Sequence, residues 1–247
     1  MDKGIYVAMT GASAALQAQS ALAQNLANVD TAGFKAVLNQ TQPYQITGAG
    51  IPSRVDATLQ NGGFDASGGP TLTTGNPLDV ALKPNAWLAV QDSAGNEAYT
   101  RAGDLRVNEN GQLITKSGRT VLSEAGPITI PPNQSVNVAP DGTISIVPQG
   151  QNPDVQANVG RLKVVEQDPT QLRRGADGLM RRNDNQPATS AAGDVLTSGA
   201  IEGSNVNPSD ALVNMISLSR AFDLQVQVLH NSDENARSAT TLLRLSS

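Results

Sequence analysis

The chain of 247 residues is long enough for one large domain or two modest ones with a buried core. Its formal net charge is −5 and its 17 basic residues form no cluster, which disfavours a nucleic-acid binder that tracks phosphates. The absence of cysteine and the presence of a single histidine, His230, exclude disulfides, thiolate metal sites, cysteine nucleophiles and any site that needs several histidines. Aromatic residues make up 3% of the chain, so its core must be aliphatic.

The N-terminal segment predicts a long amphipathic helix. Between residues 5 and 29, mostly apolar residues recur at alternating steps of three and four, the pattern of a helix with one apolar stripe. The positions are Ile5, Ala8, Ala12, Ala15, Gln19, Leu22, Leu26 and Val29. The helix should end near Asp30, because Gly33 follows and can adopt a left-handed backbone. Polar residues interrupt the apolar core that a secretory signal requires, and no apolar run approaches the ~18 residues that cross a bilayer.

The middle of the chain divides into a predicted linker and a predicted β domain. Residues 31–75 are rich in Gly, Thr, Ser and Gln without firm periodicity, and predict an extended linker. Residues 76–204 consist of short alternating runs separated by turn residues such as Asn110-Gly111 and Asp141-Gly142. Because Asn-Gly and Asp-Gly between alternating runs favour hairpins, this region predicts an antiparallel β-rich domain.

The C-terminal segment predicts a second long helix. Asn207 and Pro208 supply an N-cap and a first-turn proline, and neither glycine nor proline interrupts residues 209–247. The same alternation follows at Leu212, Met215, Ser219, Phe222, Val226, Leu229, Asp233, Ala236, Thr240 and Leu243. The predicted fold class is therefore α+β, with residues 1–30 and 205–247 pairing as a coiled-coil-like helical domain beside the central β-rich domain.

The apolar stripes at the two ends allow two interpretations. In one, the helices form an antiparallel pair that joins the ends of a single chain. In the other, both termini stay mobile in the monomer and fold when they enter a bundle of several chains. The stripes alone do not decide between them.

Motifs at both ends and in the middle resemble those of bacterial flagellar rod and hook proteins. The N-terminal motif reads NLANVDTAGFK over residues 25–35. The middle motifs are NPLDVAL over residues 76–82 and AYTRAG over 98–103, and the C-terminal motifs are GSNVNP over 203–208, MI over 215–216 and RAFD over 220–223. Within the family, the run WLAV from Trp87 is most similar to proximal-rod subunits.

The resemblance implies a structural subunit of the basal-body proximal rod, which crosses the periplasm. It implies export by the flagellar type III apparatus without a cleaved signal peptide, and polymerisation with other copies and with neighbouring rod proteins. The terminal helices would line the inner tube and the β domain would pack outside. The alternatives are a distal-rod or other axial subunit of the same family, or a compact periplasmic glycan-binding or glycan-active protein.

The predicted assembly interface combines stripe positions with two asparagines on one helix face. Its residues are Ile5, Ala12, Leu22, Asn25, Leu26, Asn28, Val29, Leu212, Met215, Phe222, Val226 and Leu229. A buried pair of Asn25 and Asn28 would fix the register of the helices; alternatively, these residues cap the helix end.

Further motif residues are predicted to shape the chain next to the helices. Gly33 supplies a turn that no other residue fits, and Phe34 anchors the chain against the β domain. Asn205 and Asn207, before Pro208, make local backbone hydrogen bonds that start the second helix. Arg220 either pairs with Asp223 on the surface or contacts another subunit.

The sequence predicts neither catalysis nor a cofactor or metal. It contains no Gly-Lys dipeptide and hence no P-loop, and neither a G-x-S-x-G elbow nor an EF-hand loop. His230 has no second histidine or cysteine to act with, so it is interpreted as a residue at the edge of the helix stripe. We expect neither a nucleic acid nor a small-molecule substrate as a partner.

Overall fold

The computed structural model describes residues 3–45, 55–152 and 155–245, which fall into two units built from segments far apart in the sequence. The helical unit combines Met1–Ala27, Val37–Phe64 and Val206–Ser247. The β unit combines Asn28–Ala36 and Asp65–Asn205. Helices at both termini and a central antiparallel β region confirm the predicted α+β class.

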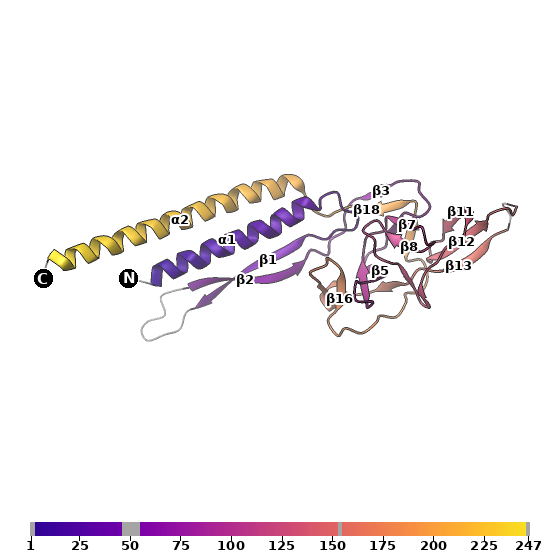
Figure 1. The fold of residues 1–247 in the computed structure, drawn as a ribbon, viewed down its shortest axis with the longest axis horizontal. Coiled ribbons are helices and arrows are strands. Elements are labelled where there is room, and N and C mark those ends of the chain that lie inside the picture. The colour runs from indigo at the N-terminus through magenta and orange to yellow at the C-terminus, as the bar shows by residue number, and fades with distance from the viewer. Residues whose placement is uncertain (1–2, 46–54, 153–154, 246–247) are drawn as a thin grey trace. The chain divides into compact units, whose positions relative to one another are not determined.

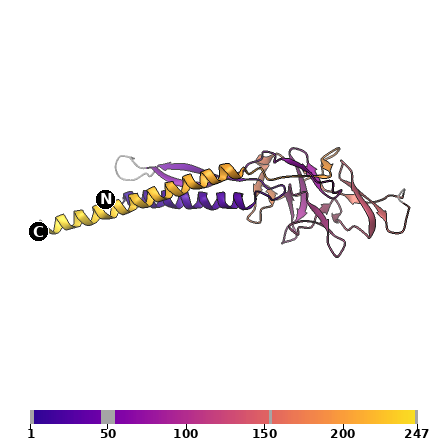
Figure 2. The same cartoon turned by 90° about the horizontal axis from the view of Figure 1, so that it is seen from above.

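The helical unit contains α1 (Lys3–Ala27) and α2 (Pro208–Leu245), which run in opposite directions side by side (Figures 1 and 2). A Cβ atom on Gly11 would lie 3.1 Å from Cδ of Gln225, so the two helices approach closely there. As far as the structure describes them, neither helix combines the length and hydropathy that a membrane span needs.

The start of α2 follows the predicted capping pattern. Oδ1 of Asn207 accepts a hydrogen bond from the backbone N–H of Ser209 at 3.0 Å, and Pro208 is the first helical residue. Asp210 in the first turn carries the charge that the positive end of the helix dipole favours. Residues next to one another in the sequence therefore determine where α2 begins.

A β-hairpin completes the helical unit. Strand β1 (Val37–Gln45) pairs antiparallel with β2 (Val55–Phe64), and both strands contact α1 (Figure 1). The region predicted as an extended linker, residues 31–75, thus contains a pair of strands. Gln, Asn and Thr dominate β1, so it lacks the apolar alternation that identifies a strand in sequence. The connection between the two strands lies outside the described residues.

The largest sheet of the β unit has five antiparallel strands in the order β14–β5–β6–β16–β15. These strands are β5 (Ala86–Gln91), β6 (Glu97–Thr100), β14 (Val164–Glu166), β15 (Leu172–Arg174) and β16 (Met180–Arg182). A short 3₁₀ helix at Pro169–Gln171 precedes β15. A second antiparallel sheet joins β11 (Asn133–Val138), β12 (Thr143–Pro148) and β13 (Ala157–Arg161).

Short strand pairs form the rest of the β unit. They are β3 (Thr71–Thr73) with β18 (Ala200–Glu202), β4 (Val80–Leu82) with β17 (Leu196–Ser198), β7 (Leu105–Val107) with β8 (Leu113–Thr115), and β9 (Leu122–Ser123) with β10 (Gly126–Pro127). Asn110-Gly111 connects β7 to β8, and Asp141-Gly142 connects β11 to β12. The two hairpins predicted from these dipeptides are therefore confirmed.

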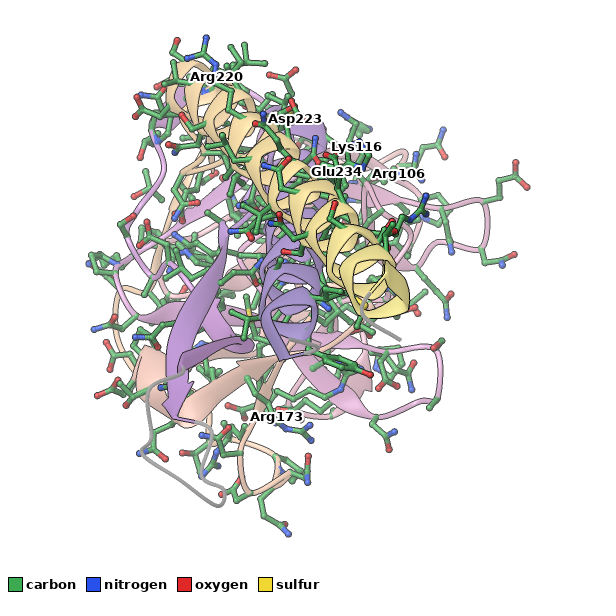
Figure 3. All side chains as sticks on the ribbon, turned by 90° about the vertical axis from the view of Figure 1, so that its left-hand side faces the viewer. Arg106, Lys116, Arg173, Arg220, Asp223 and Glu234 are labelled. Carbon is green, nitrogen blue, oxygen red and sulfur yellow. The ribbon has the colours of Figure 1, made fainter. Side chains whose placement is uncertain are left out.

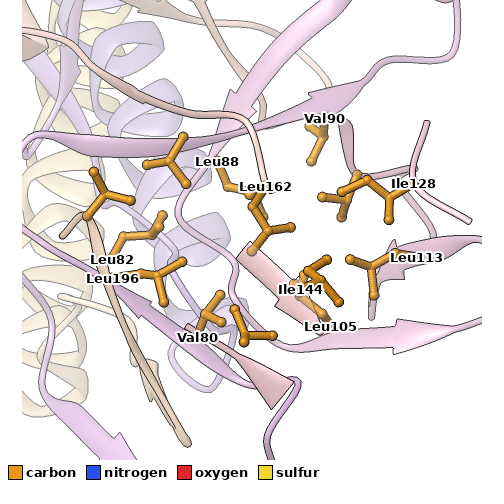
Figure 4. Packing of buried hydrophobic residues seen from close by; sticks show 14 of the residues in the cluster. Val80, Leu82, Leu88, Val90, Leu105, Leu113, Ile128, Ile144, Leu162 and Leu196 are labelled. Atoms are coloured by element: carbon orange, nitrogen blue, oxygen red, sulfur yellow. The ribbon is translucent and has the colours of Figure 1, made fainter. Parts of the chain in front are cut away.

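The core of the β unit is aliphatic, as the composition requires (Figure 4). Leu88 and Val90 of β5 join Leu113 of β8 and Ile144 of β12, and all four are fully buried. Each such side chain contributes about 1.5–3 kcal/mol to folding. Trp87, the single tryptophan, is buried on β5 and so reports on the folding of this unit alone.

Candidate functional site

The surface of α1 carries no charged side chain from Gly4 to Val29. A helix on the surface of a soluble protein normally presents a charged or strongly polar face to water. Among its inward residues, Ala8 and Ala12 are buried, while Ile5, Leu22 and Leu26 are half-buried. The predicted stripe of α1 is therefore at least partly covered within the single chain, and its contact with other subunits stays a prediction.

A second side of α1, about 100° around the helix from the predicted stripe, is exposed and also free of charge. Its residues follow the same alternation of three and four, beginning one position later than the predicted stripe. We call them the free face of α1: Tyr6, Met9, Ser13, Leu16, Ser20, Ala23 and Ala27. The side chains of Tyr6, Met9 and Leu16 are 58%, 51% and 49% exposed. The predicted stripe does not include this face. The lack of charge around the whole helix was the sequence signal for it.

The predicted stripe of α2 divides between two sides of the helix. Met215, Phe222 and Leu229 are half-buried, whereas Leu212 and Val226 are 50% and 44% exposed. The half-buried positions instead follow the series Met215, Leu218, Phe222, Gln225, Leu229 and Ser232. Because α2 is apolar on more than one side near its start, periodicity could not identify the side that a single chain covers.

The two predicted interface asparagines act separately, not as a pair. Asn25 is buried, and its Oδ1 accepts from Val37 N at 2.8 Å while its Nδ2 donates to Val37 O at 3.0 Å. Asn28 lies beyond the end of α1, where its Oδ1 accepts from the Thr31 hydroxyl at 3.1 Å. Asn25 therefore fixes β1 against α1, and Asn28 fits the alternative role at the helix end. Val29 is half-buried next to it.

The charged residues and the histidine on α2 lie at the surface. Arg220 and Asp223 are both exposed, and Figure 3 shows them on the helix. In the part of the chain that the structure describes, no ion pair joins these two residues, so the predicted surface pair is not formed. His230 is exposed too.

A buried cluster of charges lies within the β unit. Oε1 of Glu202 accepts from Nζ of Lys35 at 2.8 Å, and Oε2 accepts from Nε of Arg101 at 2.6 Å. Nη2 of Arg101 also pairs with Oε2 of Glu202. The side chains are 5%, 2% and 7% exposed in the order Glu202, Lys35 and Arg101. We call these three residues the ion cluster.

Backbone groups satisfy the remaining donors of Arg101. Nη1 donates to Ala86 O at 2.7 Å and to Lys83 O at 3.1 Å, and Nη2 donates to Leu82 O at 2.9 Å. The guanidinium also lies 5.7 Å from the ring centre of Trp87. A buried charge is tolerated when it is both paired and hydrogen-bonded, and Arg101 meets both conditions.

The surroundings of Glu202 keep it ionised. Burial alone would raise the pKa of this carboxyl, but hydrogen bonds from Arg101 and Lys35 outweigh burial and hold the pKa below its usual value. The backbone N–H of Gly69 donates to Oε1 at 3.0 Å. A Cβ on Gly69 would lie 2.1 Å from Gly203 O, so the backbone can approach here only as glycine.

Gly33 and Phe34 connect the segment after α1 to this cluster. Gly33 has φ +66°, and a Cβ there would lie 2.1 Å from the carbonyl carbon of Arg101. Its N–H donates to Glu202 O at 2.8 Å. Phe34 is buried with the guanidinium of Arg174 4.8 Å from its ring centre. Gly33 thus adopts a left-handed backbone, and Phe34 is buried within the β unit.

The side chain of Asn205 bonds to residues much farther away in the sequence than predicted. Instead of a local helix-starting bond, its Oδ1 accepts from Ala36 N at 2.8 Å and its Nδ2 donates to Asp65 O at 3.0 Å. Nδ2 also lies 3.2 Å from Ser67 O. This side chain therefore ties together segments that are distant in sequence, and Asn207 alone caps the helix.

The ion cluster brings together motifs from three parts of the chain. Lys35 ends the N-terminal motif, Arg101 lies in the middle motif, and Glu202 directly precedes the C-terminal motif. The motifs include Lys35 and Arg101, but no role was predicted for them. Because the motifs also contain Asp30 and Asp79, the sequence did not single out the three residues that pair. All three charges are paired, so the arrangement is suited to fixing backbone segments. Among the described residues, no group of three acidic or histidine side chains could hold a metal.

Comparison with known proteins agrees with these motifs. Three family models match in chain order: "Flagella basal body rod protein" over residues 5–35, "Flagellar hook protein FlgE/F/G D1 domain" over 81–146, and "Flagellar basal body rod FlgEFG protein C-terminal" over 197–242. Together they place the chain among the axial proteins of the flagellum.

Relatives that match almost the whole chain identify the family within the flagellar axial proteins. The flagellar basal-body rod proteins FlgF of Escherichia coli (strain K12) and Salmonella typhimurium (strain LT2) are each 41% identical over 254 residues, covering 100% of both chains compared. FlgG of Buchnera aphidicola subsp. Schizaphis graminum is 30% identical, covering 98% of this chain and 100% of the relative. The chain belongs to the family of flagellar basal-body rod proteins, which are structural subunits, and it is similar to FlgF over its whole length.

Replacing Glu202 should destabilise the β unit strongly. Glu202→Gln leaves Lys35 and Arg101 buried without a counter-charge, and we expect a loss of about 3–5 kcal/mol in the free energy of unfolding. Urea unfolding followed by Trp87 fluorescence measures it. Asp184→Asn, which removes the exposed ion pair with Arg182, is the matched control and should cost less than about 1 kcal/mol. Equal losses in the two variants would contradict the role of the cluster.

The same variant should change the acid dependence of stability. Because the folded-state pKa of Glu202 is lowered, its contribution is present above the ordinary carboxyl value of 4.5 and is lost as pH falls through the folded value. Stability of the wild-type chain should therefore fall more steeply below pH 4.5 than that of Glu202→Gln. Parallel profiles would show that Glu202 is not held ionised.

Proposed function

We propose that this chain is a proximal-rod subunit that joins the basal body by packing α1 and α2 with helices of other copies and of neighbouring rod proteins. Within the chain the two helices pair in a coiled-coil-like manner. One observation carries the proposal: α1 is free of charge on every side from Gly4 to Val29, and one apolar face is exposed.

The exposed apolar area is larger than isolated surface residues would explain. Besides the free face of α1, the large apolar side chains of α2 that are exposed are Leu212, Val213, Ile216, Leu224, Val226 and Val228. Each such side chain gains about 1.5–3 kcal/mol when it is fully buried. Exposed apolar side chains gathered along helix faces in this way are typical of interaction sites.

Identity with relatives supports the proximal position. The two relatives that are 41% identical over the whole chain, from Escherichia coli and Salmonella typhimurium, are both FlgF. The compact glycan-binding or glycan-active alternative fits less well, because a protein that works as a monomer gains nothing from an exposed apolar face on a terminal helix. We propose no catalytic role, since the ion cluster is fully paired.

Export without a cleaved signal is part of the proposal. Thr10, Ser13 and Gln17 break the apolar run that a secretory signal needs, and they lie on a continuous helix in the folded chain. The flagellar export apparatus is the partner proposed for this step.

A charge on the free face of α1 should block assembly without unfolding the chain. Leu16→Asp places a carboxylate at a position that is 49% exposed, so thermal unfolding followed by far-ultraviolet circular dichroism, which reports on the helices, should stay unchanged. Burial of that charge against a neighbour would be costly, and we expect the variant to be lost from isolated basal bodies. Immunoblots of basal bodies measure its incorporation.

Gln17→Asp is the matched control, because Gln17 is the adjacent exposed residue and lies off the free face. It should enter basal bodies as the wild-type chain does. Normal incorporation of Leu16→Asp would show that the free face is not an assembly surface.

The helices of the dilute monomer should be digested before the β unit. Their uncovered apolar faces leave them with little tertiary support, so local opening is easy. A protease of broad specificity is required, because α1 lacks Lys and Arg between Gly4 and Val29. Mass spectrometry should find early loss of residues 1–27 and 206–247 around a resistant fragment that contains Trp87. Equal protection of all segments would favour a compact monomer instead.

A further inference from the structure

We infer that the free face of α1 binds a particular stripe of α2 on a second copy of this chain, in a head-to-tail contact. The inference rests on the proposed function and assigns the surfaces that meet. Its basis is the distribution of charge around the two helices.

A stripe on α2 is exposed, and none of its five residues is charged; Arg220 borders it four residues before Leu224, and Asp210 lies three residues before its first member. Counting 100° per residue, the stripe lies roughly 110° around the helix from the half-buried series that includes Phe222. We call it the free stripe of α2: Val213, Ser217, Ala221, Leu224 and Val228, all of them exposed. Leu224 and Val213 are 62% and 61% exposed, the largest values among the large apolar side chains of this helix that the structure describes.

Charge distinguishes the free stripe from the other exposed side of α2. The other side contains the apolar residues Leu212, Ile216 and Val226, but Asp223 and His230 share it. If that side packed against α1, Asp223 would lose water without gaining a cation, because α1 has none between Gly4 and Val29 and, among the described residues, Arg220 forms no ion pair with Asp223. The free face of α1 therefore packs more favourably against the free stripe of α2 than against the side that contains Asp223.

The lengths of the two surfaces are compatible. From Tyr6 to Ala27 the free face of α1 extends roughly 30 Å, and from Val213 to Val228 the free stripe extends roughly 20 Å. Towards its end the free face carries only small residues, Ser20, Ala23 and Ala27, which leave room for large side chains such as Leu224. Apolar and small side chains on facing helices allow close packing.

The second copy is the occupant that this arrangement favours. Each chain has both surfaces, on two helices that already lie side by side, so a second chain placed against the free face continues the same layer of helices. Because the two surfaces differ, the contact is heterologous, and each added copy leaves one of each surface open. An open contact of this kind suits a subunit of a rod, whereas α1 against α1 would close into a dimer.

Cross-linking of single-cysteine chains tests the assignment directly, because the natural chain has no cysteine. Cells whose only source of this protein is two co-expressed versions would carry Leu16→Cys in one and Leu224→Cys, with an epitope tag, in the other. Basal bodies are isolated and treated with a short bis-maleimide. Any link between the two versions is intermolecular, and we expect a tagged–untagged dimer.

Two controls decide what the dimer means. Asp223→Cys in place of Leu224→Cys moves the thiol by one residue to the charged side, and the dimer should be lost. Tagged and untagged Leu16→Cys together should give no dimer. Met9→Cys with Val228→Cys supplies an independent pair with the same expected dimer, should either first substitution prevent entry into basal bodies.

Each other outcome overturns the inference in a recognisable way. Dimers of Leu16→Cys with itself would show a symmetric contact, and equal linking through Asp223→Cys would show that the assigned stripe is wrong. Chains that enter basal bodies without any dimer overturn the head-to-tail contact and leave the proposed function standing. Absence of the wild-type chain from basal bodies would overturn the proposed function together with the inference.

Discussion

The absence of charge from α1 beyond Lys3 is the constraint on which the account of this molecule depends. The exposed face that carries Tyr6, Met9 and Leu16 has no charged side chain to favour water, so this face is suited to a partner. The single chain supplies partners for two sides, through α2 and through the β1–β2 hairpin. It leaves the free face open, and the remaining partner must come from outside the chain.

The ion cluster meets a different requirement. The chain passes between the β unit and the helical unit after Ala36, before Asp65 and after Asn205, and these three residues lie close together. Glu202, held by Lys35 and Arg101, joins the segment after α1, the middle of the β unit and the segment before α2. Three residues after Glu202, Asn205 adds hydrogen bonds to Ala36 and Asp65. Residues in or beside three of the family motifs thus meet at an internal junction.

Features that depend on neighbouring residues could be predicted from the sequence, whereas long-range contacts could not. The cap at Asn207, the hairpin turns at Gly111 and Gly142 and the left-handed Gly33 follow from local conformational preferences. The β1–β2 hairpin escaped prediction because its stability comes from contact with α1 and not from its own pattern. The roles of Asn25 and Glu202 depend on partners 12 and 167 residues away, which spacing along the chain does not reveal.

A density map of the isolated basal body, resolved to side chains, tests the central claim most directly. The account predicts that Tyr6, Met9 and Leu16 are covered by a helix of another subunit, with no water-filled space along the free face of α1. A map in which these side chains border solvent, or in which α1 contacts only its own chain, would contradict it.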